Sequence, residues 1–105
     1  MKKALSHSLA IYLALDGDAV VGLVRLVGDS FSSIFVQDLI VLPSYQRQGI
    51  GSNLMKEALG DYKDAYQVQL VTDQTEKTLG FYRSLGFETL STYDCTGMIW
   101  VDRKR

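Results

Sequence analysis

The sequence is poor in the residues that build cross-links and metal sites. Its 105 residues include one Cys, one His and one Pro. A single thiol, Cys95, excludes an internal disulfide and a cysteine-rich zinc site, and the lone His7 leaves only carboxylates as metal ligands. We therefore expect no bound metal, and a protein that works in a reducing compartment, the cytoplasm.

An excess of charge of one sign is also lacking. Eleven Lys and Arg residues nearly balance twelve Asp and Glu residues, for a net charge of -1 at pH 7. Without a basic surplus to neutralise phosphates, we expect neither nucleic acid nor a membrane surface as a partner. No apolar run approaches the roughly 20 residues that cross a bilayer. The apolar start of the chain is interrupted by Ser6-His7-Ser8 and ends at Asp16-Gly17-Asp18 without a cleavage signal, which argues against a signal peptide.

The residues that are present describe one globular domain. Hydrophobic residues make up 47% of the chain, enough for one buried core but not two, so we expect a single domain over 1–105. Apolar alternation predicts strands at 9–15, 19–27, 34–42 and 66–70, the third of them central in the sheet. Helical spacing predicts helices from 50 to a stop at 60–61 and over 75–85, with a left-handed cap at Gly86. Residues 1–8 are typical of a helix end, and 87–93 with 96–101 of a closing strand pair.

This order of elements predicts an α+β fold, a mixed and mostly antiparallel sheet flanked by helices. The most informative motif lies where the central strand meets the first long helix, in Gln46-x-x-Gly49-x-Gly51. Two residues without side chains at a helix start let backbone N–H groups approach an anion, and the helix dipole adds attraction. A phosphate is the natural ligand of such a turn. Glycines also mark any tight strand-to-helix turn, so a purely structural role stays open.

Three segments at the right separations resemble the GNAT superfamily of acetyl-CoA-dependent N-acetyltransferases. Residues 38–43 (DLIVLP) resemble its central strand, 45–51 (YQRQGIG) its R/Q-x-x-G-x-G/A loop, and 81–87 (FYRSLGF) its F-Y-x-x-x-G-F segment. Family members usually carry about 30 more residues at the front. The strand at 9–15 is therefore expected to be an exposed edge, and a homodimer or a truncated chain is the expected explanation. Thr75 and Thr78 also depart from the Asn and Ala that are common in the family.

The resemblance implies transfer of the acetyl group of acetyl-CoA to a primary amine. Asp38, the only carboxylate inside the central strand, is a candidate base, or else a residue that orders the sheet or orients the amine. Tyr82 is the candidate proton donor to the leaving thiolate, with a core aromatic as the alternative. A splay or bulge near Ile40 and Val41 would release a backbone N–H for the thioester oxygen. The expected acetyl-CoA-binding residues are Ile40, Val41, Gln46, Arg47, Gln48, Gly49, Ile50, Gly51 and Ser52.

The acceptor is expected to be a small-molecule or peptide amine, and no motif narrows it further. A different class of function also stays open, a non-catalytic CoA-binding or interaction module with a shortened acceptor site. For the remaining residues we expect ordinary roles. Cys95 is expected to be a small buried hydrophobe, His7 a surface residue, and Trp100 with Tyr93 part of the packing of the closing hairpin.

Overall fold

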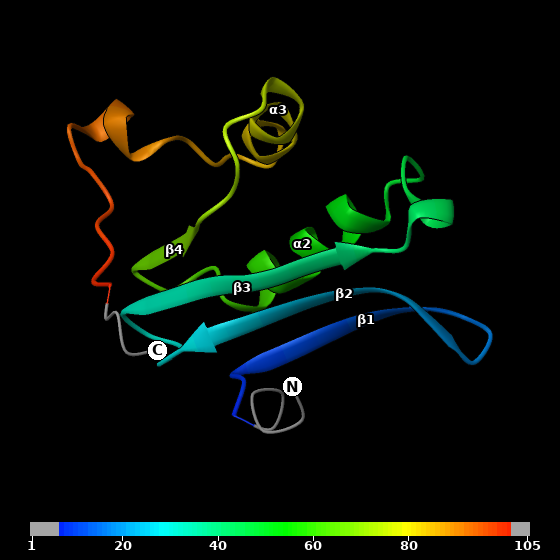
Figure 1. Cartoon of the computed structure of the whole chain (residues 1–105). Coiled ribbons are helices and arrows are strands. Elements are labelled where there is room, and N and C mark those ends of the chain that lie inside the picture. Colours follow the sequence, from blue (N-terminus) through cyan, green and yellow to red (C-terminus); the bar gives the residue numbers. More distant parts are fainter. Residues whose placement is uncertain (1–6, 102–105) are drawn as a thin grey trace. The chain divides into compact units, whose positions relative to one another are not determined.

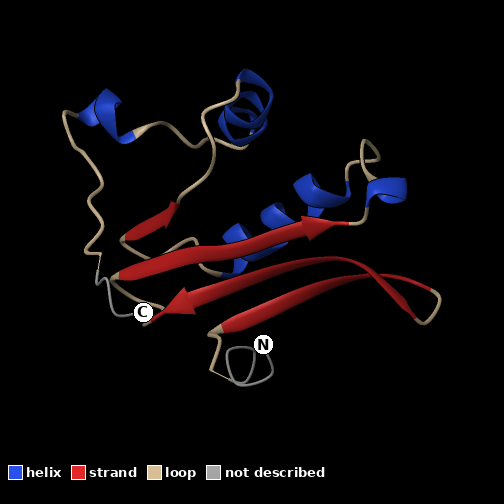
Figure 2. Ribbon diagram, in the orientation of Figure 1, coloured by secondary structure: helices blue, strands red, loops and turns tan. Residues whose placement is uncertain are grey.

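The computed structural model describes residues 7–101 and divides into two compact units, Met1–Thr72 and Asp73–Arg105. The predicted helix end at 1–8 falls mostly outside the described residues. Figures 1 and 2 show the elements, and each unit is treated by itself below. The first unit holds β1 (Ala10–Asp16), β2 (Ala19–Gly28), β3 (Ser33–Val41), the short 3-10 helix η1 (Pro43–Tyr45), α2 (Ile50–Asp61) and β4 (Gln67–Leu70). The second holds α3 (Glu76–Ser84) and the 3-10 helix η2 (Leu90–Tyr93).

The four strands form one mixed sheet in the order β1-β2-β3-β4. β1 with β2 and β2 with β3 are antiparallel, and β3 with β4 is parallel. The two-residue turn Gly17-Asp18 joins β1 to β2, with Gly17 at a φ of 62°, a region that glycine enters at little cost. The predicted α+β fold, with a mostly antiparallel sheet and a central third strand, is confirmed.

The core lies between the sheet and α2, which packs on one face of β1, β2 and β3 (Figure 1). Helical spacing puts the apolar residues of α2 on one side, and that side meets the apolar side chains of β2 and β3. Gly22 permits this contact, since a Cβ there would lie 3.1 Å from Ile50 Cγ2 and 3.2 Å from Leu54 Cδ1. α2 ends at Asp61, within the predicted stop at 60–61. The buried hydrophobic side chains are Val21, Val24, Leu26, Ile34, Val36, Leu54, Met55 and Ala58.

A β-bulge interrupts the pairing of β2 with β3. Leu26 pairs with Val36 and Arg25 with Asp38, so Gln37 is the extra residue of β3. Because successive strand residues point to opposite faces, an extra residue reverses the face of all that follow. Val36 therefore points toward α2, and Asp38 points to the other face of the sheet.

The second unit confirms the predicted helix and its cap. Thr75 begins α3 by accepting a hydrogen bond from the Thr78 N–H. At the other end Gly86 is left-handed, with φ 99°, and its N–H donates to the Arg83 carbonyl at 3.0 Å. The Phe87 N–H donates to the Tyr82 carbonyl at 3.1 Å, which completes a Schellman cap.

The predicted closing strands at 87–93 and 96–101 are wrong. The structure has η2 at Leu90–Tyr93 and no strand over the rest of 87–101. Thr89 starts this turn and its hydroxyl lies 2.9 Å from that of Ser91, a local bond that competes with sheet pairing. Cys95 is exposed rather than buried, and Trp100 is 80% exposed, so neither packs as predicted. His7 is exposed, as expected.

Candidate functional site

The segment 46–52, here called the glycine loop, joins η1 to α2 with an unusual backbone. Arg47 and Gly49 both have positive φ values, 65° and 82°. A left-handed conformation costs a non-glycine residue about 1–2 kcal/mol, so the strain at Arg47 must be supported by its surroundings. The side chain of Gln46 provides such support, because its Nε2 donates to the Val41 carbonyl at 2.9 Å and ties the loop to the end of β3.

The N-terminus of α2 has no protein cap. Its N-cap residue is Gly49, which has no side chain to accept a hydrogen bond, and no acidic residue lies in the first turn. The first helical bond in this turn is donated by the Asn53 N–H to the Gly49 carbonyl, at 3.0 Å. The preceding amides of Ile50, Gly51 and Ser52 are therefore available to an anion, and the helix dipole favours negative charge there.

The edge of β3 next to the glycine loop is open in the first unit. β4 pairs with β3 only as far as Leu70 opposite Val36, so residues 37–41 have no strand partner on that side among the described residues of this unit. The Leu42 N–H donates to the Val21 carbonyl at 2.9 Å. By alternation the Ile40 amide faces β2 and the Val41 amide faces the open edge. The bulge itself lies at Gln37, earlier than the expected position near Ile40 and Val41.

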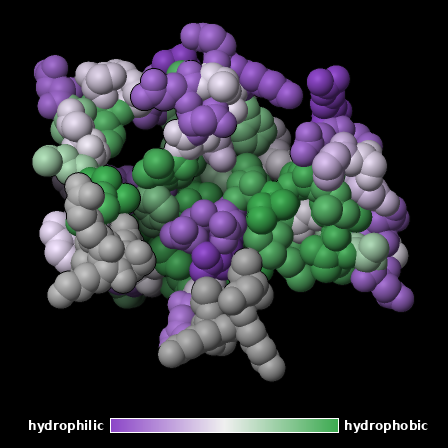
Figure 3. All heavy atoms as spheres, viewed as in Figure 1, coloured by the Kyte–Doolittle hydropathy of each residue, from purple (hydrophilic) through white to green (hydrophobic). Residues whose placement is uncertain are grey.

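Asp38 is paired with an arginine that the sequence reading missed. Arg25 is buried, at 9% exposed, and its Nε donates to Asp38 Oδ2 at 2.6 Å. Its Nη1 also donates to Ser8 Oγ at 3.3 Å. Arg25 is the one charged residue in an otherwise apolar β2, and this isolation in the sequence could have identified it as a functional candidate. Figure 3 shows hydrophobic residues gathered over the sheet around a compact hydrophilic group.

Tyr82 lies in α3 of the second unit. Its ring makes edge-to-face contacts with Phe81 and Phe87, with centroids 5.0 and 5.8 Å apart. Burial, and then the negative charge of Asp73, raise the pKa of the Tyr82 hydroxyl above its ordinary value of 10.0. The hydroxyl is therefore protonated at neutral pH and can donate a proton or a hydrogen bond.

The structure thus brings part of the predicted set together. The first unit places the Gln46 side chain on Val41, next to the glycine loop and the uncapped start of α2, while Asp38 lies further back on β3. Tyr82 belongs to the second unit. In the part of the chain from 7 to 101, no cluster of three or more His, Cys, Asp or Glu side chains is arranged to hold a metal ion. No helix in this range is long and apolar enough to cross a membrane.

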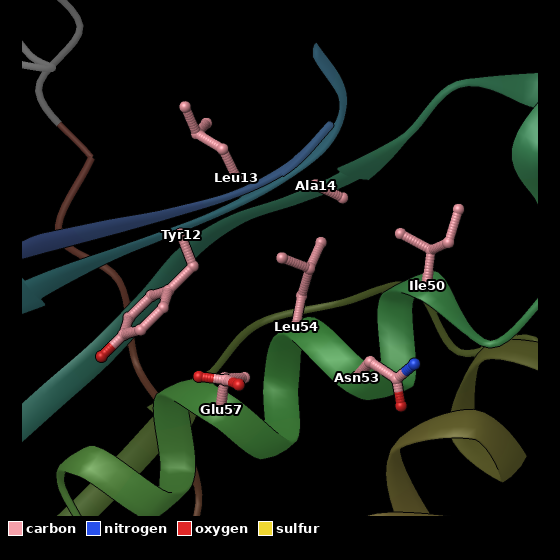
Figure 4. Close-up of a pocket in the computed structure, with 7 residues that line it drawn as sticks. All are labelled: Tyr12, Leu13, Ala14, Ile50, Asn53, Leu54 and Glu57. Carbon is pink, nitrogen blue, oxygen red and sulfur yellow. The ribbon is translucent and has the colours of Figure 1, made fainter. Parts of the chain in front are cut away.

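A groove of about 410 Å³ lies between β1 and α2, and no sequence motif predicted it. Figure 4 shows the Tyr12 side chain reaching from β1 toward α2 beside Glu57. The Tyr12 hydroxyl donates to Asp61 Oδ2 at 2.6 Å, and burial, followed by this bond, raises its pKa. The groove is lined by Tyr12, Leu13, Ala14, Ile50, Asn53, Leu54 and Glu57.

The first unit is thus a mixed α+β sheet domain in which α2 starts without a cap beside an open edge of β3. A family model described as an acetyltransferase (GNAT) domain matches residues 7–89. The chain belongs to this family.

Solved structures and curated proteins agree with that assignment. A GNAT-family acetyltransferase from Streptococcus pneumoniae TIGR4 is 82% identical, with a TM-score of 0.92, covering 96% of this chain and 76% of that one. A serotonin N-acetyltransferase 2, chloroplastic, from Oryza sativa subsp. japonica is 29% identical over 83% of this chain and 46% of its own length. A GNAT-family acetyltransferase from Elizabethkingia anophelis, solved with acetyl-CoA bound, shares the fold at 22% identity and a TM-score of 0.69, over 83% and 58%. The chain spans less than half the length of the curated relatives it matches.

Proposed function

We propose that this chain carries an acetyl-CoA-dependent N-acetyltransferase activity. The observation that carries the proposal is the uncapped N-terminus of α2, which begins in the left-handed glycine loop beside the open edge of β3. Membership of the GNAT family and a fold neighbour solved with acetyl-CoA supply the ligand class. The pyrophosphate of acetyl-CoA is the anion that such a helix start would take.

The cofactor would be held mainly by backbone groups. Amides of 50–52 would bind the pyrophosphate, and the exposed Arg47 would add positive charge. Gln46 would act indirectly, because its bond to the Val41 carbonyl fixes the loop against β3. The Val41 amide, on the open edge, would bind a carbonyl oxygen of the pantetheine arm or of the thioester.

The chemistry requires a neutral amine. An alkyl amine with a pKa of about 10.4 is protonated at pH 7, and freeing its lone pair costs about 4.6 kcal/mol. In our proposal Asp38 binds the ammonium group or, through a water molecule, takes its proton. The neutral amine nitrogen then bonds to the thioester carbonyl carbon and the carbon–sulfur bond breaks. The Tyr82 hydroxyl gives its proton to the departing thiolate, and the second proton that the nitrogen loses returns through solvent to the Tyr82 oxygen.

The acceptor is a small-molecule or peptide primary amine, and the protein works in the cytoplasm. It forms a homodimer, for which the support is the exposed edge strand β1 with its outward-facing Ile11, Leu13 and Leu15. An unprotected edge strand of this kind favours pairing with another chain.

One observation favours a second candidate function, a non-catalytic CoA-binding module. The Asp38 carboxylate is already bound to Arg25 through Oδ2, so the group proposed to receive the amine proton is engaged with another side chain. In such a module the glycine loop would bind CoA without turnover.

Release of the CoA thiol distinguishes the two functions. The purified chain is mixed with acetyl-CoA and with serotonin, spermidine or lysine as probe amines, and free thiol is followed with a thiol-reactive dye. An N-acetyltransferase releases thiol in proportion to the amine and acetylates it, as mass spectrometry would detect. Binding of acetyl-CoA with no amine-dependent release from any probe would favour the non-catalytic module.

A further inference from the structure

We propose that Arg25 is a positioning residue for the acetyl transfer: it fixes the Asp38 carboxylate so that one oxygen of that group faces the acceptor amine. This inference rests on the proposed function. Arg25 itself would touch neither acetyl-CoA nor the acceptor, and would act only through Asp38.

The contacts of the pair show a division between the two carboxylate oxygens. Oδ2 accepts the hydrogen bond from Arg25 Nε at 2.6 Å. Oδ1 accepts no hydrogen bond from the described residues, and the Asp38 side chain is 31% exposed while that of Arg25 is 11% exposed. The arginine thus occupies Oδ2, and Oδ1, which has no donor among the described residues, can accept a hydrogen bond from a ligand.

The bulge in β3 places Asp38 on the same face of the sheet as Arg25. With regular alternation Asp38 would share a face with Val36 and point into the core against α2. The extra residue Gln37 reverses its direction and sets it opposite Arg25. Ser8 accepts a hydrogen bond from the same guanidinium, so among the described residues Arg25 is bonded to both Asp38 and Ser8.

A fixed carboxylate matters because the χ2 angle of an aspartate is otherwise broad and nearly two-fold. With Arg25 bonded to Oδ2, the direction of Oδ1 is set before the amine binds. Less conformational entropy is therefore lost when the amine binds. Arg25 also supplies the counter-charge that a carboxylate near an apolar face requires. Its loss should therefore weaken recognition and orientation of the amine and leave acetyl-CoA binding intact.

A double-mutant cycle on amine turnover tests the inference. kcat/KM for the best of the three probe amines is measured for wild type, Arg25→Met, Asp38→Asn and the double variant, with Arg25→Lys as the charge-conserving variant. Both single substitutions should lower kcat/KM for the amine at least tenfold with KM for acetyl-CoA unchanged. The kcat/KM of the double variant should be no more than about twofold lower than that of the less active single variant. Arg25→Lys should retain more of the wild-type kcat/KM than Arg25→Met does.

Several controls separate this inference from folding and from the proposed function. Tyr12→Phe removes a hydrogen bond on the opposite face of the same sheet and should leave kcat/KM for the amine unchanged. If Arg25→Met does not melt cooperatively, the comparison of Arg25→Lys in the wild-type and Asp38→Asn backgrounds carries the test. Two results would overturn the role of Arg25. One is a loss of kcat/KM in the double variant equal to the product of the two single losses, and the other is an Arg25 variant that is folded and fully active. A wild-type chain that acetylates no probe amine would instead overturn the proposed function.

Discussion

Asp29 is an exposed carboxylate that the turn between β2 and β3 depends on. Its Oδ1 accepts hydrogen bonds from the amides of Phe31, Ser32 and Ser33 at 3.0, 2.9 and 3.1 Å, and the Ser32 hydroxyl donates to Oδ2. These bonds, that of the Ser32 hydroxyl first, hold the pKa of Asp29 well below its ordinary value of 3.8. The folded state therefore favours the ionised form more than the unfolded chain does.

This shift predicts an acid-sensitive turn. Above pH 3.8 the contribution of Asp29 to the free energy of unfolding is fully present, and it is lost as the pH falls toward the lowered pKa, because the unfolded chain binds the proton first. Asp29→Asn removes this titration. Urea unfolding at pH 7 and pH 3 should show a smaller acid loss for the variant than for wild type. Equal losses would mean that the turn does not depend on this charge.

The Tyr82 hydroxyl is the proposed proton donor to the leaving thiolate. Tyr82→Phe keeps the ring contacts with Phe81 and Phe87 and removes only the proposed proton donor. We expect kcat for acetyl transfer to fall about 10²-fold or more, in the range of general acid catalysis, with the affinity for acetyl-CoA unchanged. Steady-state kinetics and a titration with CoA measure the two effects. Unchanged turnover would assign the tyrosine to packing alone.

At the scale of elements, the contact of α2 with β2 depends on a glycine. In Gly22→Ala the new Cβ would lie 3.1 Å from Ile50 Cγ2 and 3.2 Å from Leu54 Cδ1, so the helix or its side chains must shift. We expect a loss of about 1 kcal/mol in the free energy of unfolding. The matched control is Gly60→Ala in α2, where a new Cβ would have nothing within 4 Å. This variant should gain about 0.5–1 kcal/mol in the free energy of unfolding. A neutral or stabilising Gly22→Ala would contradict this close packing.

Arg47 in the glycine loop combines a strained left-handed backbone with the positive charge that we propose faces the pyrophosphate. Arg47→Gly relieves the left-handed strain at φ 65° and should stabilise the unliganded chain by about 0.5–1 kcal/mol, since the greater freedom of glycine in the unfolded chain offsets part of the gain. It also removes the charge proposed to face the pyrophosphate, so acetyl-CoA affinity should fall. Arg47→Gln keeps the strain and loses only the charge. Thermal unfolding of both variants, with and without acetyl-CoA, separates the two effects, and unaltered affinity in both would remove Arg47 from the site.

Elements defined by local signals were predictable, and those defined by a distant partner were not. The Gly86 cap depends only on neighbouring residues, and it is confirmed. The closing strands failed because hydroxyls near Thr89 form a local turn, which apolar alternation does not reveal. In the site, Asp38 was identifiable as a carboxylate in an apolar strand. Its pairing with Arg25 was not, because that pairing depends on a bulge that the sequence alone does not locate.

At the scale of the whole molecule, the buried hydrophobic side chains among the described residues all belong to the first unit, between Val21 and Ala58. The same unit carries the glycine loop and the start of α2. Acetyl-CoA binding at that helix start would therefore be linked directly to the stability of the main core. The single domain over 1–105 stays a prediction, since the two compact units have their own internal contacts.

Thermal unfolding of the 105-residue chain with and without acetyl-CoA tests the central claim most directly. A ligand that binds only the folded state, present at about 100 times its dissociation constant, adds about 2.7 kcal/mol to the free energy of unfolding. Acetyl-CoA and CoA near 1 mM should each raise Tm, ATP should not, and the increase should shrink in Arg47→Gln. A cooperative transition that acetyl-CoA leaves unmoved would contradict the claim that the start of α2 binds this cofactor.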